Sequence, residues 1–166
     1  IGADGRGSTV RKQLGLTLHE TQPRTVCAGL LVRHAPQLLD YLAAGTRGDA
    51  YYFLFPRDHG VTRLYILWSI EQRQRFAGAD GARRFLDTFR SYCFPHAEQM
   101  AAAEPIGPCV TYPMNDGYLD SPLAHNSVLV GDAAGWNDPI VGQGLSIALR
   151  DVRIVSELLL QDRADW

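Results

Sequence analysis

Residues 127–144 read SVLVGDAAGWNDPIVGQG, and this run predicts how the last third of the chain folds. The apolar residues before Gly131 have the length of a short buried strand, and the glycines and proline that follow are typical of turns. From Gly144 onward, apolar residues recur at helical spacing, at Leu145, Ala148, Leu149, Val152, Val155 and Leu159. We therefore expect a strand, an acidic tip at Asp132, a loop, a glycine turn and a long helix. Because open α/β sheets bind ligands where their strands end, Asp132 is a candidate binding residue.

A second acidic turn lies at the other end of the chain, where residues 1–8 read IGADGRGS. Asp4 and Gly5 are expected to form the turn, and Ser8 can accept hydrogen bonds from the first amides of a short helix over residues 9–14. The chain opens almost directly on this turn, as if the body of a preceding strand were missing. We therefore expect a fragment of a larger protein.

The middle of the chain is rich in strand-forming residues. The sequence predicts strands over residues 25–33, 51–55, 61–68 and 109–112. The second and third are joined by PRDHG and should form a hairpin. Nearby prolines place the fourth at a sheet edge. Helices are expected over residues 36–45 and 82–93, and a further short one from Pro95.

The composition argues against several function classes. The chain has 166 residues, which is enough for one sizeable core, and its 16 Lys plus Arg against 18 Asp plus Glu give a net charge of -2. We therefore expect no nucleic-acid partner. No apolar run approaches the roughly 20 residues that a membrane span needs, and no signal peptide is visible. These features predict a protein without a membrane span and with a cytoplasmic location.

The cysteines and histidines indicate neither disulfides nor a metal site. Cys27, Cys93 and Cys109 are odd in number and lie among apolar residues, which favours buried, reduced thiols. The five histidines are scattered, and no two have the i, i+4 spacing that would bring two imidazoles together on a helix. We expect no metal ligands.

Each acidic turn also has a purely structural interpretation, since an Asp after a strand often caps a turn and glycines allow a helix to begin tightly. Together, however, the two turns resemble the two later cofactor-binding motifs of the flavoprotein monooxygenases related to para-hydroxybenzoate hydroxylase. The segment from Gly131 through Pro139 to Gly144 carries the resemblance, and Ala133, Ala134 and Asp151 fit the same pattern. The chain departs from the family at Gly135, where histidine is frequent, and at Ser146, where asparagine is frequent.

The resemblance implies an α/β (α+β) fold in which part of a Rossmann-like FAD-binding domain encloses a substrate domain with a mixed or antiparallel sheet. Residues 1–22 and 115–166 would belong to the FAD-binding domain, and residues 23–114 to the substrate domain. Asp132 would hold the ribityl chain of FAD, and the backbone of residues 142–146 would follow the pyrimidine end of the flavin ring. The implied cofactor-binding residues are Asp4, Gly5, Gly131, Asp132, Pro139, Gly142, Gln143, Gly144, Leu145 and Ser146.

The resemblance also implies a reaction. NAD(P)H would reduce FAD, and O2 would supply one oxygen atom to hydroxylate or epoxidise a small organic substrate, with no catalytic side chain needed from the protein. The hairpin offers Tyr52, Phe53, Tyr65 and Trp68 as candidates for an aromatic pocket, although a core role is favoured for each. The chain has no glycine-rich turn for the adenosine half of FAD.

Several alternatives stay open. A related FAD-dependent reductase or halogenase would share these motifs, and a non-catalytic α+β module that binds a hydrophobic small molecule would need the turns only for structure. The oligomeric state, the substrate and the choice between NADH and NADPH are not predicted.

Overall fold

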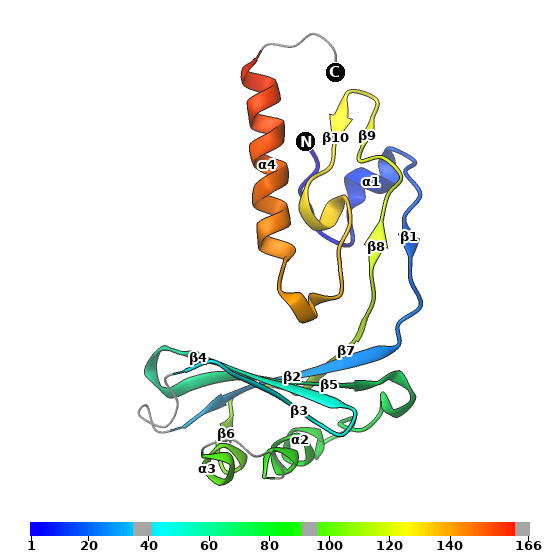
Figure 1. The fold of residues 1–166 in the computed structure, drawn as a ribbon. Coiled ribbons are helices and arrows are strands. Elements are labelled where there is room, and N and C mark those ends of the chain that lie inside the picture. Colours follow the sequence, from blue (N-terminus) through cyan, green and yellow to red (C-terminus); the bar gives the residue numbers. More distant parts are fainter. Residues whose placement is uncertain (35–40, 91–95, 162–166) are drawn as a thin grey trace. The chain divides into compact units, whose positions relative to one another are not determined.

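The computed structural model describes residues 1–34, 41–90 and 96–161. The chain divides into two compact units, which are described separately below (Figure 1). We call Pro23–Met114 the central unit, and Ile1–Gln22 together with Asn115–Trp166 the flanking unit.

The central unit is built on an antiparallel sheet, which has six strands in the described part of the chain (Figure 1). The strand order is β3-β4-β5-β2-β6, and β7 also pairs with β2. The strands are β2 (Thr25–Arg33), β3 (Ala43–Arg47), β4 (Ala50–Arg57), β5 (Val61–Ser69), β6 (Glu104–Pro105) and β7 (Val110–Met114). The strand predicted over residues 25–33 is therefore confirmed with its bounds. The hairpin is also confirmed, and both of its strands are longer than expected.

The hairpin turn and the edge strand follow from local chemistry. Between β4 and β5 the chain reverses through Asp58–Gly60, where His59 and Gly60 have positive φ values of 61° and 69°. In β7, Pro113 lies opposite Val26. A proline is tolerated there because β7 has no further partner strand within the described sheet, so the edge prediction is confirmed.

The core of the central unit lies between the sheet and two helices on one side of it, α2 (Gly81–Phe89) and α3 (Ala97–Ala101) (Figure 1). Phe85 and Phe89 are completely buried, and Phe85 meets Phe76 edge-on at 5.2 Å between ring centres. Phe76 in turn packs edge-on against Trp68 at 4.9 Å. The amphipathic helix is thus confirmed up to Phe89. The expected continuation through residues 91–93 and the start at Pro95 lie outside the described residues.

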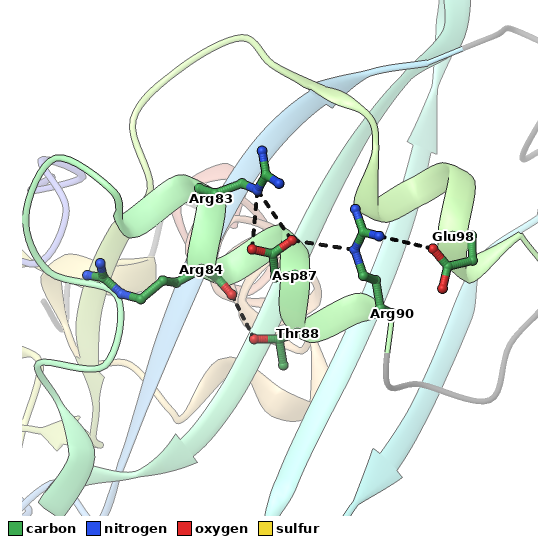
Figure 2. A network of polar contacts seen from close by, with 6 residues as sticks. All are labelled: Arg83, Arg84, Asp87, Thr88, Arg90 and Glu98. Carbon is green, nitrogen blue, oxygen red and sulfur yellow. Dashed lines mark hydrogen bonds and ion pairs between the residues drawn. The ribbon is translucent and has the colours of Figure 1, made fainter.

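A chain of ion pairs joins the exposed sides of α2 and α3 (Figure 2). Asp87 lies between Arg83 and Arg90, at 3.2 and 3.4 Å, and Arg90 also reaches Glu98 at 3.3 Å. All four side chains are at least 44% exposed, so each pair contributes at most about 1 kcal/mol. The aromatic core, rather than this network, holds the two helices to the sheet.

The helix expected over residues 36–45 is wrong at its C-terminal end. Ala43 and Gly45 belong to strand β3, where Gly45 lies opposite Tyr52 of β4. A Cβ atom on Gly45 would collide with the ring and hydroxyl of Tyr52, so this glycine makes room for a side chain instead of ending a helix. Residues 36–40 lie outside the described residues.

The flanking unit combines short strand pairs with two helices (Figure 1). β1 (His19–Glu20) pairs with β8 (Gly117–Tyr118), and β9 (Leu123–Ala124) pairs with β10 (Ser127–Val128), both antiparallel. Gly2 joins Leu129 in a parallel bridge. The strand expected before Asp132 is therefore real but brief: β10 ends at Val128, and one bridge continues it.

Both helices expected in the flanking unit are present. α1 spans Thr9–Gln13, and the Ser8 side chain accepts a hydrogen bond from the Arg11 amide as predicted for its cap. α4 spans Gly144–Leu160. Of the apolar stripe on α4, however, only Val155 is buried; its members Leu145, Leu149, Val152 and Leu159 are exposed. None of the described helices is long and apolar enough to cross a membrane.

The described cysteines are reduced thiols in different surroundings. Cys27 is buried, whereas Cys109 is half-buried, and burial raises the pKa of the Cys109 thiol to about 11. Cys93 lies outside the described residues. Within the described ranges, no group of three or more His, Cys, Asp or Glu side chains is arranged to hold a metal ion.

Candidate functional site

The two acidic turns lie together in the flanking unit. Arg6 of the first turn contacts Asp132 of the second, which is 126 residues away in sequence. The Gly2 amide donates to the Val128 carbonyl at 2.8 Å, and the Val130 amide donates to the Gly2 carbonyl at 3.0 Å. Beyond this bridge, the Arg6 Nε atom lies 3.3 Å from the Asp132 carboxylate. The sequence thus brings both predicted motifs to one place.

Asp4 shapes its own turn. Its Oδ1 atom accepts a hydrogen bond from the Ser8 hydroxyl at 2.5 Å, and its Oδ2 atom accepts from the Thr9 and Val10 amides at 2.7 and 3.2 Å. The bond from Ser8 is the largest influence that lowers the pKa of Asp4 from its ordinary value of 3.8, because it favours the charged form. Both carboxylate oxygens are therefore engaged with α1, and Gly5, with a φ of 77°, completes the turn.

Arg11 is a buried cation that joins the two turns. Only 4% of the residue is exposed, and its guanidinium donates to the Ala133 carbonyl at 2.8 Å and to the Arg6 carbonyl at 2.6 Å. The guanidinium also lies over the Trp136 ring, 6.0 Å from its centre. Among the described residues, no carboxylate pairs with it. Arg11 therefore acts through backbone oxygens, one from each turn.

Asp132 lies in a short 3-10 turn, Gly131–Ala133, that packs against α4. Gly131 has a φ of 57°, and a Cβ atom there would be 3.3 Å from the Ala148 side chain, so glycine is favoured for two reasons. The Gly131 amide donates to Asp151 of α4 at 3.0 Å. This contact fixes the turn, while the Asp132 side chain itself stays 43% exposed.

The start of α4 is open. Pro139–Val141 forms a 3-10 turn, and Gly142 takes a left-handed conformation with a φ of 69° before the helix begins at Gly144. No side chain caps the first turn of α4, and residues 139–146 are all exposed. First-turn amides without a side-chain cap attract negatively charged or carbonyl oxygens. A half-exposed carboxylate and an open helix start fit a ligand that has both hydroxyl groups and a polar ring edge, as FAD does.

Backbone hydrogen bonds between Gly117 and Trp136 hold the loop that connects the Asp132 turn to the start of α4. Their amides and carbonyls exchange hydrogen bonds of 2.7 and 2.8 Å. A Cβ atom on Gly135 would be 2.6 Å from the Gly117 carbonyl oxygen, so the close approach of the two backbones favours glycine at this position. Trp136 is only 9% exposed, and its indole N–H has no partner among the described residues.

A cavity of about 920 Å³ lies within the flanking unit, beside the candidate site. It is lined by parts of residues 117–137 and by one face of α4 that includes Ile154 and Val155. Of the ten residues expected to bind the cofactor, only Gly131 lines it. The expected cofactor residues therefore form an open surface rather than this cavity.

In the central unit, strand register separates the four aromatic residues of the hairpin. Tyr52 and Trp68 are buried in the core on the helix side. Phe53 and Tyr65 lie opposite each other in neighbouring strands and pack against a second cluster, Cys27, Leu67 and Met114. Tyr112 joins this cluster, where burial, and after it the contact with Cys27, raises the pKa of its hydroxyl.

The structure also shows what sequence reasoning missed. The pairing of Arg6 with Asp132 and the bond from Arg11 to the Ala133 carbonyl had not been predicted. Arg6 lies between two glycines, where no hydrophobic periodicity indicates its role, and its partner Asp132 is 126 residues away in sequence. For Arg11, the only hint was a cation that follows a helix cap.

The chain is similar to several known proteins. The chain is 28% identical over 156 residues to the FAD-dependent monooxygenase ankC of Aspergillus thermomutatus, covering 91% of this chain and 26% of that protein. It is 26% identical to the ubiquinone hydroxylase UbiL of Rhodospirillum rubrum, covering 96% of this chain and 36% of the relative. The digeranylgeranylglycerophospholipid reductase 2 of Methanothermobacter thermautotrophicus is also 26% identical, with coverages of 95% and 39%.

Solved structures show the same fold. PqsL of Pseudomonas aeruginosa matches with a TM-score of 0.76 and 25% identity, covering 97% of this chain and 46% of that one. The chain thus spans less than half the length of each relative named here. The mixed α/β fold with antiparallel sheets is confirmed. The family model described as the FAD binding domain matches residues 1–162, and the chain therefore belongs to this family of FAD-binding proteins.

Proposed function

We propose that the chain supplies the flavin-binding and substrate-binding parts of an FAD-dependent monooxygenase, which uses NAD(P)H and O2 to hydroxylate or epoxidise a small organic substrate. The observation that carries this proposal is the joining of the two acidic turns, by Arg6 to Asp132 and by Arg11 to the Ala133 carbonyl. Relatives named as a monooxygenase and a hydroxylase support the reaction class.

Within the flanking unit, Asp132 would accept hydrogen bonds from ribityl hydroxyls. Its half-exposed carboxylate suits this role, since charge-assisted bonds to hydroxyl groups are short and strong. The backbone from Gly142 through Gln143, Gly144 and Leu145 to Ser146 would face the polar edge of the flavin ring. Gly131 and Pro139 would shape the turns that present these groups, and Asp4 and Gly5 would hold the first turn in place. FAD supplies the redox chemistry when bound, and the protein supplies position and electrostatics.

The central unit would carry the substrate on the sheet face opposite its helices. Phe53 and Phe55 stack at 6.0 Å between ring centres, and Phe55 meets Tyr65 edge-on at 5.9 Å. Phe55 is 36% exposed, so this face presents aromatic surface that the helices do not cover. Such a surface suits an apolar or aromatic molecule. In support, PqsL was solved in complex with the small organic molecule 2-aminobenzoylacetate.

A reductase is the second candidate, because one relative, which is 26% identical, is named as a reductase. It would use the same flavin contacts, but adding substrate would not increase its O2 consumption. A halogenase would consume O2 only when halide is present. A binding module without enzymatic activity would hold no flavin.

The test is to express the chain within its complete reading frame and record the absorption spectrum of the purified protein. We expect a yellow protein whose flavin bleaches with NADH or NADPH, and whose O2 uptake rises with an organic substrate. Flavin reduction without substrate-dependent O2 uptake would favour the reductase. A colourless, folded protein that gains no flavin spectrum when FAD is added would contradict the proposal.

A further inference from the structure

The Arg6 side chain has an unusual position for a surface arginine. Its Nε atom pairs with Asp132 at 3.3 Å, and its guanidinium carbon lies over the Trp136 ring at 5.1 Å from the centre. Together, the contact with the ring and the ion pair limit where the guanidinium can lie. Arg6 is therefore held at the carboxylate that the proposed function assigns to the ribityl chain.

This arrangement leaves hydrogen-bond donors of Arg6 available to a ligand. A guanidinium has five N–H donors, and the contact with Asp132 uses the one on Nε; among the described residues no partner is seen for the two terminal nitrogens. The pair is also easily opened, since Arg6 and Asp132 are 44% and 43% exposed. Exposed ion pairs of this kind contribute little to stability.

The chemistry of the ligand supplies the second step. In FMN and FAD the ribityl chain ends in a phosphate, so a carboxylate that holds ribityl hydroxyls has a phosphate within the reach of a neighbouring arginine. Arginine binds phosphate through paired N–H donors, and this contact is stronger than a solvent-exposed contact with one carboxylate oxygen. Riboflavin has the hydroxyls but no phosphate.

We propose that Arg6 is a phosphate-recognition residue of the flavin site, which pairs with Asp132 in the flavin-free protein and turns its terminal nitrogens to the ribityl phosphate when flavin binds. The inference rests on the proposed function and adds the group that selects phosphorylated flavins over riboflavin. It also explains why the two acidic turns are joined by a side-chain pair that a ligand can open, beside the buried contact of Arg11.

The test compares dissociation constants of FAD, FMN and riboflavin, measured by quenching of flavin fluorescence on the flavin-free complete protein. For Arg6→Gln we expect affinity for FMN and FAD to fall about tenfold, and affinity for riboflavin to change less than twofold. Arg6→Lys keeps the charge without the paired donors. Its affinities for FMN and FAD should lie between those of the unaltered protein and those of Arg6→Gln. Higher salt should reduce the difference in affinity between FMN and riboflavin in the unaltered protein, because salt screens the contact between Arg6 and the phosphate. In Arg6→Gln, salt should leave this difference unchanged.

Lys12→Gln is the matched control, since Lys12 is an exposed cation on α1 and its loss changes the net charge equally. It should alter all three constants less than twofold. An equal effect of Arg6→Gln on the three flavins, or no effect, would overturn the role of Arg6 while leaving the proposed function intact. A complete protein that binds none of the three would overturn both. Thermal melting of each variant separates lost binding from lost folding.

Discussion

Replacing Arg11 with alanine should lower the free energy of unfolding by about 2–4 kcal/mol. The change leaves the buried Ala133 carbonyl and the partly buried Arg6 carbonyl without their donor, and it removes the side chain that packs against Trp136. Hydrogen bonds from a charged donor each contribute about 1.5–3 kcal/mol, and part of this is offset because a buried cation no longer has to be desolvated. Urea unfolding, followed by circular dichroism, measures the loss.

Two further variants test the reason for this loss. Arg11→Lys keeps the charge, but its single ammonium cannot reproduce the guanidinium fork that reaches two carbonyls, so it should recover less than half of the stability. Lys12→Ala, on the exposed side of the same helix, should stay within about 0.5 kcal/mol of the unaltered protein. An Arg11→Ala variant as stable as Lys12→Ala would show that the two turns do not depend on this cation.

Replacing Asp132 with alanine should weaken FAD binding about ten- to a hundredfold. The carboxylate is half-exposed, packs into no core and is assigned to ribityl hydroxyls, so its loss should affect ligand binding far more than folding. The measurement is the FAD dissociation constant of the complete protein, with the flavin content after purification as a second readout. Asp120→Ala is the matched control, because Asp120 is an exposed carboxylate of the same unit whose described partner is His19. Equal affinity of the two variants would remove Asp132 from the site.

Much of the fold could be predicted from the sequence because periodicity and turn chemistry are local signals. The hairpin is an example: β-branched and aromatic runs flank a short turn in which Gly60 supplies a positive φ. The helix α4 is another, since its 17 residues, Gly144–Leu160, contain no proline and no glycine after the first position. The failure at Gly45 has a local cause as well. A glycine that ends a helix and one that makes room for Tyr52 across a strand pair look alike in one sequence.

The burial of α4 could not be predicted in the same way. The apolar stripe gives the period of the helix, but it does not say which residues will cover it, and Leu145 and Leu149 are 73% and 61% exposed. Two members of the stripe, Ala148 and Val155, do lie on the inward side. Asp151, which is not part of the stripe, accepts a hydrogen bond there from the Gly131 amide. Burial depends on partners that are distant in sequence, whereas periodicity does not.

The candidate site was predictable as two motifs and not as a set of contacts. Asp132 and the open start of α4 were expected from their residue types, and their binding roles stay predictions. The contacts of Arg6 and Arg11 join positions more than 100 residues apart, so no pattern within either motif indicates them. Asp4 shows a related limit: its residue type suits ligand binding, but both of its oxygens cap α1.

The central claim is that Asp132, the turn that contains Asp4 and the start of α4 belong to one flavin site. Hydrogen–deuterium exchange of the complete protein, with and without saturating FAD, tests it most directly. We expect FAD to slow exchange at the amides of residues 4–8, 131–133 and 142–146, and to leave the buried strand β2 (Thr25–Arg33) unchanged. Saturation with FAD that leaves residues 131–146 exchanging at the same rate would contradict the claim.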